Sequence, residues 1–232
     1  ADTLYGGVRE LNYDWSTTGG SIANNNDGTA IFNADNVGDY TVSVNTTDGI
    51  YTSNTKNKNI TISVPPILNA ITNSSDIIKA GEELVFNSDI AYNGNEPLTY
   101  DWSTSNGNLT NNNDGTALFS ANSNGMYDIS LLVSNGYFDS SQKTKTIEVI
   151  EPAVITSIDS SKNIIQPSED LLLTGVVDYN GTRDLTFDWS ADGGTVSNHN
   201  DGTATFSAED DGHYSIDLEV SDGVFNSGIE SK

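Results

Sequence analysis

The stretch Tyr13-Asp14-Trp15-Ser16 recurs as Tyr100-Asp101-Trp102-Ser103 and again as Phe187-Asp188-Trp189-Ser190. These three tryptophans are the only ones in the sequence, and consecutive ones are 87 residues apart. Aligned without a gap, residues 66–145 and 153–232 are identical at 34 of 80 positions. A repeat of this length and fidelity indicates a tandem array, and the array organises the whole fold.

The period divides the 232 residues into three repeats, numbered here in chain order. We predict a first repeat without its N-terminal strands, a complete second repeat and a third repeat without its final strand, over residues 1–65, 66–152 and 153–232. Pro65-Pro66 and Glu151-Pro152 lie at the two joints. These joints are too short and too rich in proline to behave as flexible linkers.

Within each repeat, apolar and polar residues alternate with the period of a β-strand. Leu11, Tyr13 and Trp15 share one parity, which predicts a half-buried strand. Asn26-Asp27-Gly28 has the composition of a hairpin turn. No helical period of useful length is present, so we predict an all-β chain built as a tandem array of antiparallel sandwiches. The predicted core is a set of recurring aromatic residues: Trp15, Trp102, Trp189, Tyr40, Tyr127, Tyr214, Phe32, Phe119 and Phe206.

These residues resemble the PKD-type immunoglobulin-like domain. The resemblance rests on the aromatic-x-Trp of the third strand, the Gly-x-Tyr that opens the penultimate strand, and the Asp-Gly or Asn-Gly hairpin before the last strand. Residues 210–214, Asp-Asp-Gly-His-Tyr, also look like a tyrosine corner. The Phe-Gly-Asp-Gly run usual after the tryptophan is replaced by residues 16–20, Ser-Thr-Thr-Gly-Gly, so the chain is a divergent member. The resemblance implies extracellular spacer, adhesion or accessory modules of large surface or secreted proteins, usually without catalysis.

Charge narrows the range of partners. The sequence has 9 Lys plus Arg against 33 Asp plus Glu, a net charge of −24. Such a chain repels nucleic acid and anionic membrane surfaces. No apolar run approaches the roughly 20 residues that cross a bilayer, so we expect no membrane insertion in this segment. The acidic charge has two compatible interpretations. It can form a soluble surface in salty water, and it can bind divalent cations.

Calcium is the one cofactor that the sequence suggests. An EF-hand is excluded, because Asn24-Asn25-Asn26-Asp27-Gly28 lacks the acid required at the first position of that loop and the glutamate at the twelfth. Acids near the joints could still supply the oxygen ligands that calcium prefers. The candidate metal ligands are Glu82, Glu83, Glu151, Glu169 and Asp170.

Catalysis is not expected. Nucleophilic catalysis needs a base beside a nucleophile, and the only histidines are His199 and His213. The first and second repeats carry Asn25 and Asn112 in place of His199, which indicates loop variation and not a catalytic position. We therefore predict a protein that is not an enzyme.

Aromatic side chains limit carbohydrate binding. Eighteen of the 20 aromatic residues fall in six columns that recur with the period, which predicts core positions and few exposed platforms. A carbohydrate-binding face built on stacked aromatics would need Tyr5, Tyr92 and Tyr179 to be exposed. Contact with a cell surface or a polysaccharide stays open as a partner.

We expect a non-catalytic segment of a large extracellular fibre, filament or adhesin that acts as a stiff rod or spacer. The alternative is an accessory region of a secreted multidomain hydrolase. The expected partners are neighbouring repeats of the same protein or other copies of the subunit. We also expect further polypeptide to complete the open ends, as a longer array or as strands donated between subunits.

Overall fold

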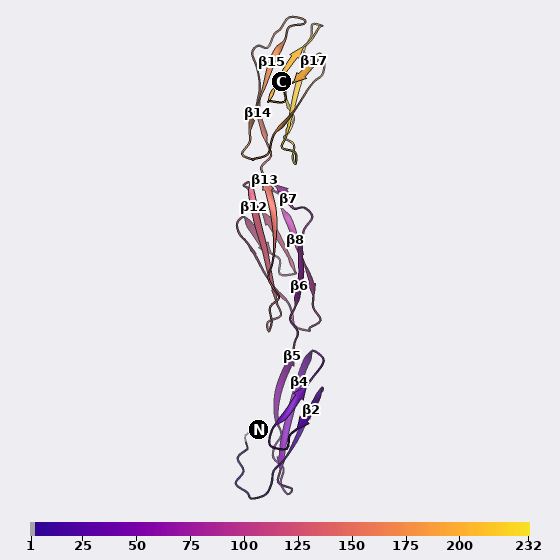
Figure 1. Cartoon of the computed structure of the whole chain (residues 1–232), viewed down its shortest axis with the longest axis vertical. Coiled ribbons are helices and arrows are strands. Elements are labelled where there is room, and N and C mark those ends of the chain that lie inside the picture. The colour runs from indigo at the N-terminus through magenta and orange to yellow at the C-terminus, as the bar shows by residue number, and fades with distance from the viewer. Residues whose placement is uncertain (1–2) are drawn as a thin grey trace. The chain divides into compact units, whose positions relative to one another are not determined.

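The computed structural model describes residues 3–232, and within this range it consists of strands, turns and loops without a helix (Figure 1). The prediction of an all-β chain is confirmed. A membrane-crossing helix is accordingly absent from this range. The chain contains two compact units, and the division between them runs through the second repeat. One unit holds the described residues up to Ala70 together with 88–101 and 131–143, and the other holds 71–87, 102–130 and 144–232.

The first repeat forms a three-stranded sheet in the order β1-β4-β5 and a two-stranded hairpin of β2 with β3. Trp15 lies opposite Val44 in the antiparallel register of β1 and β4. The strands are β1 (Asn12–Thr17), β2 (Ser21–Asn24), β3 (Ala30–Asn33), β4 (Gly38–Thr47) and β5 (Lys56–Ile62).

The second repeat forms two four-stranded sheets, in the orders β10-β11-β8-β6 and β7-β13-β12-β9. Strand β13 runs parallel to β7, with Glu148 beside Ile77 and Ile150 beside Lys79. The strands are β6 (Ile67–Thr72), β7 (Ile77–Lys79), β8 (Leu84–Ala91), β9 (Thr99–Thr104), β10 (Asn108–Asn111), β11 (Thr116–Ser120), β12 (Gly125–Ser134) and β13 (Lys143–Ile150).

The third repeat forms a four-stranded sheet in the order β14-β15-β18-β17 and a three-stranded sheet in the order β16-β19-β20. Strand β19 is shorter than its counterpart β12, and β20 contains two residues where β13 contains eight. The strands are β14 (Val154–Ser160), β15 (Leu171–Asp178), β16 (Thr186–Ala191), β17 (Thr195–Asn198), β18 (Thr203–Ser207), β19 (Ile216–Ser221) and β20 (Glu230–Ser231).

A chain of aromatic rings joins the two sheets of the second repeat. Phe86 of β8 lies 6.4 Å from both Trp102 of β9 and Phe119 of β11, measured between ring centroids. Phe119 lies 5.5 Å from Tyr127 of β12. Phe86 and Phe119 are fully buried, and Trp102 is 7% exposed. These rings pack in tilted and edge-to-face arrangements, which are the favourable geometries for aromatic pairs.

The predicted core residues are buried to different degrees in the three repeats. Trp102, Phe119 and Tyr127 are all buried in the second repeat. In the third repeat Trp189 and Phe206 are buried and Tyr214 is half-buried. In the first repeat Trp15, Phe32 and Tyr40 are only half-buried. The same sequence columns are therefore most buried in the second repeat and least buried in the first.

One aromatic column differs from its prediction as core. Tyr51 is 78% exposed and Phe138 is 48% exposed, and Phe225 is half-buried. All three lie in the loop after the penultimate strand, where recurrence reflects a conserved loop shape and not burial. Tyr5 is also 40% exposed, whereas Tyr92 and Tyr179 are half-buried.

A tyrosine corner is present in every repeat. The hydroxyl groups of Tyr40, Tyr127 and Tyr214 each donate a hydrogen bond of 2.9 Å to a backbone carbonyl four residues earlier. The bond ties the loop before the penultimate strand to the start of that strand, as in Ig-like sandwiches.

Candidate functional site

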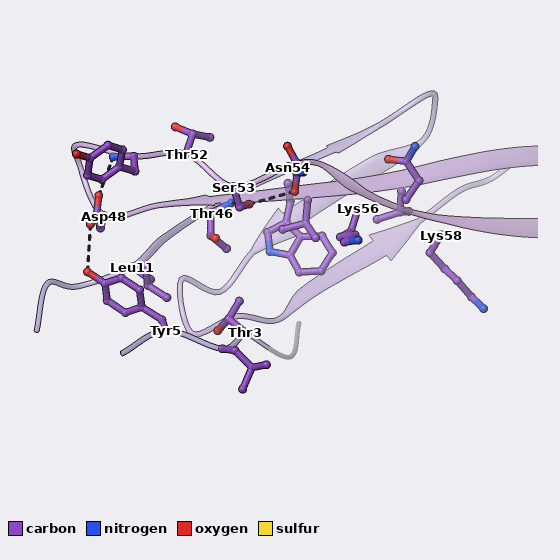
Figure 2. A pocket seen from close by; sticks show the side chains of 16 residues that line it. Thr3, Tyr5, Leu11, Thr46, Asp48, Thr52, Ser53, Asn54, Lys56 and Lys58 are labelled. Atoms are coloured by element: carbon purple, nitrogen blue, oxygen red, sulfur yellow. Dashed lines mark hydrogen bonds between the residues drawn. The ribbon is translucent and has the colours of Figure 1, made fainter. Parts of the chain in front are cut away.

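One hollow lies in the first repeat and another in the third. The hollow in the first repeat, called here the first-repeat groove, has a volume of about 720 Å³. Its apolar floor includes Leu11, Trp15, Val42 and Val44. Figure 2 shows Tyr5 and Asp48 at one end of it, joined by a hydrogen bond, and Lys58 at the other.

The first-repeat groove lies where the complete second repeat has additional strands. In the second repeat the counterpart of Trp15 is Trp102, which packs against Phe86 of β8. The printed sequence of the first repeat contains no counterpart of Phe86, and Trp15 is half-buried. The apolar floor of the first-repeat groove thus consists of residues that correspond to the core of the second repeat.

The polar end of the first-repeat groove is a turn held by Asp48. Its carboxylate accepts hydrogen bonds from the backbone N–H groups of Tyr51 and Ile50, at 2.8 and 3.0 Å, and from the hydroxyl of Tyr5 at 3.1 Å. The two backbone donors, and less strongly the Tyr5 hydroxyl, hold the pKa of Asp48 below its ordinary value. The hydrogen bonds of the Asp48 carboxylate thus stabilise its own loop.

The second hollow, called here the third-repeat groove, has a volume of about 670 Å³. Its floor includes Leu171, Leu173, Phe206 and Ile216. Lys232 lies at its edge and donates a hydrogen bond of 3.0 Å from Nζ to the carbonyl oxygen of Ile158. His213 also lines this groove.

The counterpart of Asp48 in the second repeat is Asn135, a buried residue that the sequence analysis missed. Its side-chain amide nitrogen, with two hydrogens to donate, lies 2.8 Å from the carbonyl oxygen of Val64, 2.9 Å from the hydroxyl of Ser63 and 3.0 Å from the hydroxyl of Tyr92. Its side-chain oxygen accepts from the backbone N–H groups of the following turn. Asn135 therefore bonds the loop after β12 to the segment that follows β5 of the preceding repeat.

In the third repeat the same position is Asp222, which is 3% exposed. Its Oδ1 accepts from the backbone N–H groups of Val224 and Phe225, but its buried Oδ2 has no hydrogen-bond partner among the described residues. The buried hydroxyl of Tyr179 also lacks one. Burial, with a contribution from the negative charge of Asp222, raises the pKa of Tyr179. A carboxylate cannot donate a hydrogen bond as the Asn135 amide does. Fewer of the buried polar atoms at this position are therefore hydrogen-bonded than in the second repeat.

Further contacts lie around the joint that precedes the third repeat. The ammonium group of Lys79 lies 5.1 Å from the centroid of the Phe225 ring, within the range of a cation–π interaction. Arg183 forms an ion pair of 2.8 Å with Glu148. The backbone N–H of Glu151 donates to the side-chain oxygen of Asn124.

The candidate calcium ligands are not gathered into a site. In the described residues, no group of three or more Asp, Glu, His or Cys side chains is placed to hold a metal ion. The Glu82 carboxylate accepts from the backbone N–H of Lys79, and Glu169 accepts from Gln166 and pairs with Lys162. Glu83 and Asp170 are exposed, and Glu151 is half-buried. Calcium binding stays a prediction from charge, without a converging ligand set behind it.

His199 has a structural role in the described geometry. Its Nδ1 lies 2.9 Å from the hydroxyl of Thr203 and its Nε2 lies 3.2 Å from that of Thr205. In the other repeats, the side-chain amides of Asn25 and Asn112 donate at 2.8 and 2.9 Å to the threonine counterparts of Thr203. Histidine therefore substitutes for asparagine in bracing the same hairpin.

The Asx-rich hairpins are braced internally. The carboxylates of Asp27, Asp114 and Asp201 each accept from the hydroxyl and the backbone N–H of the threonine two residues later. These bonds, that from the hydroxyl first, lower the pKa of all three aspartates. Asn26 has a φ of 63° and Gly28 one of 88°, left-handed values that suit asparagine and glycine.

No family model and no curated protein matches the sequence. Solved structures do. The chain is similar to the N-terminal eight Ig domains of the Down syndrome cell adhesion molecule, with a TM-score of 0.54 and 15% identity over 97% of this chain. It is also similar to a three-domain Ig segment of titin, with a TM-score of 0.53 and 15% identity over 95% of this chain.

The chain has a tandem Ig-like fold. This likeness concerns the fold alone. The chain spans 37% of the cell adhesion molecule fragment and 86% of the titin segment.

Proposed function

We propose that this chain is a non-catalytic structural segment of a large extracellular fibre or adhesin, in which divergent PKD-type repeats act as a stiff spacer. The tandem Ig-like fold supports a structural role, because the apolar floors of both grooves consist of core residues and His199 braces a hairpin. The acidic surface keeps such a segment soluble and away from anionic membranes.

The observation that carries the proposal is the hydrogen bonding of Asn135. A flexible linker would leave the end of one repeat free of the next, whereas Asn135 bonds directly to Ser63 and Val64 beside the Pro65-Pro66 joint. Proline restricts the backbone of the joint itself. A joint with both features is suited to transmitting orientation from one repeat to the next.

Spin-label distance measurements test the stiffness. The chain has no cysteine, so Asp35→Cys with Asn122→Cys places two unique labels at equivalent exposed positions of the first two repeats. We expect a narrow distance distribution, and a broad one when Pro65→Gly and Pro66→Gly are added as the matched control. A wild-type distribution as broad as that of the glycine variant would contradict the spacer role.

The same spin labels test whether calcium binds to the acids near the joints. If joint acids converge around the ion in solution, added calcium should narrow the distribution relative to a chelator. Identical distributions in calcium and in chelator would remove calcium from the account and leave the acidic surface as a solubilising feature.

A further inference from the structure

A buried turn residue occupies the same position in the second and third repeats, but its chemistry differs between them. In the second repeat it is Asn135, whose amide nitrogen lies within 3.0 Å of three oxygen atoms, those of the Val64 carbonyl and of the Ser63 and Tyr92 hydroxyls. The amide thus brings donor hydrogens to a place where oxygen atoms converge. In the third repeat the residue is Asp222, which forms the same turn but has no amide hydrogens.

Two oxygen atoms at this position of the third repeat are buried without a hydrogen-bond partner among residues 3–232. They are Oδ2 of Asp222, a residue that is 3% exposed, and the hydroxyl oxygen of Tyr179. Their counterparts in the second repeat, Nδ2 of Asn135 and the hydroxyl oxygen of Tyr92, lie 3.0 Å apart. The charge of Asp222 contributes to the raised pKa of Tyr179, so the two groups are neighbours in the third repeat as well.

A buried, ionised carboxylate is costly unless a positive charge or a hydrogen-bond donor meets it. The cationic side chains near this joint have other partners. The guanidinium of Arg183 forms its ion pair of 2.8 Å with Glu148, and the ammonium of Lys79 lies over the ring of Phe225. Within residues 3–232, no lysine or arginine forms an ion pair with Asp222.

The oxygen atoms at this position suit a monovalent cation. The single carboxylate of Asp222 carries one negative charge, which a monovalent ion cancels, whereas a divalent ion would leave a positive charge buried. Calcium takes about six to eight oxygen ligands, and the described residues place no group of three or more acidic, histidine or cysteine side chains around a metal. The further oxygens are neutral. They are the Tyr179 hydroxyl and the carbonyl of Glu151, which is the counterpart of the Val64 carbonyl and likewise precedes a proline.

We propose that Asp222 and Tyr179 form a binding site for a sodium ion at the joint between the second and third repeats. Asp222 Oδ2 and the Tyr179 hydroxyl oxygen bind the ion, and the Glu151 carbonyl oxygen is the third protein ligand. The ion supplies the positive charge that the amide of Asn135 supplies in the second repeat. Sodium is preferred to potassium, because potassium binds more oxygens at longer distances. The proposal goes beyond the spacer role and does not depend on it.

Amide hydrogen exchange of the whole chain in two salts tests the site. The turn amides of Val224 and Phe225, which donate to Asp222, report on the third repeat, and the equivalent amides of Tyr137 and Phe138 are the internal control in the second. Sodium chloride is compared with N-methylglucamine chloride at equal ionic strength, because a chain with a net charge of −24 responds to any salt. At saturation we expect sodium to slow exchange of the third-repeat turn by about 5-fold or more. The control amides should not change.

Two variants separate ion binding from general stabilisation. Asp222→Asn carries its own donor hydrogens, so its turn should exchange in both salts as slowly as the wild type does in saturating sodium. The stabilisation by this substitution is then largest without sodium. Tyr179→Phe keeps the ring but removes one ligand, and should need more sodium for half the effect. Tyr137→Phe is the matched control, since it removes the hydroxyl of a residue that is 61% exposed and should leave the sodium dependence unchanged.

The same measurements identify other occupants of the position. Equal exchange of the wild-type turn in the two salts would mean that a proton or a water completes it, and would overturn the sodium site. A sodium effect that persists in Asp222→Asn would place the ion elsewhere and would overturn the site as well. Half the effect at a lower concentration of potassium chloride than of sodium chloride would contradict the choice of sodium.

Discussion

Replacing Trp102 with alanine is expected to lower the free energy of unfolding of the second repeat by about 3–5 kcal/mol. The indole is 7% exposed and packs against Phe86, which in turn packs against Phe119. Its removal leaves a cavity that β-strands on both sides cannot close without distortion. The indole N–H has no hydrogen-bond partner among residues 3–232, so packing alone carries the loss.

The opening free energy of the β12 amides, from hydrogen exchange on the whole chain, measures this effect for the second repeat alone. Tyr137→Ala is the matched control, because Tyr137 is an aromatic residue of the same repeat that is 61% exposed. The control should stay within about 0.5 kcal/mol of the wild type. A loss below about 1 kcal/mol for Trp102→Ala would show that the ring is not a core anchor.

The second large effect is expected from Asn135→Asp. The substitution replaces an amide nitrogen within hydrogen-bonding distance of three oxygens with a carboxylate that has no hydrogen to donate. The Tyr92 hydroxyl already donates to Glu96, and the carbonyl of Val64 has no hydrogen to donate. We expect a loss of about 3 kcal/mol from a buried charge that faces a carbonyl oxygen.

The reverse substitution can be made in the third repeat. Asp222→Asn converts the unsatisfied Oδ2 into an amide donor, as Asn135 has, and should raise the stability of β19 by about 1 kcal/mol. Asn93→Asp is the control, since this asparagine is exposed and adds the same charge. Equal small effects from Asn135→Asp and Asn93→Asp would mean that the buried amide contributes nothing to the joint.

The alternating pattern around the tryptophans was sufficient to predict three strands and their buried faces. Asp14, Asp101 and Asp188, which alternate with the aromatic residues along the strand, are exposed, and Asp14 accepts a cross-strand hydrogen bond of 3.3 Å from Asn45. Parity along a strand is a local property, so it is readable from a single sequence.

The contacts of Asn135 and the parallel pairing of β7 with β13 could not be read in this way. Both join segments about 70 residues apart, so neither follows from the alternation of residues along a single strand. A signal for the first did exist, because Asp48-Gly49, Asn135-Gly136 and Asp222-Gly223 recur with the period. Recurrence alone, however, does not distinguish a turn residue from a buried donor, just as it did not distinguish Tyr51 from a core residue.

The central claim is that the three repeats share one Ig-like design and that the core is most fully buried in the second repeat and least buried in the first. Hydrogen exchange on the unmodified 232-residue chain tests it most directly, by comparing Ile129–Val133 with the counterparts Val42–Thr46 and Ile216–Val220. The account predicts that the central segment exchanges slowest, by about 100-fold or more relative to the first repeat. Equal protection of all three segments in a strictly monomeric chain would contradict it.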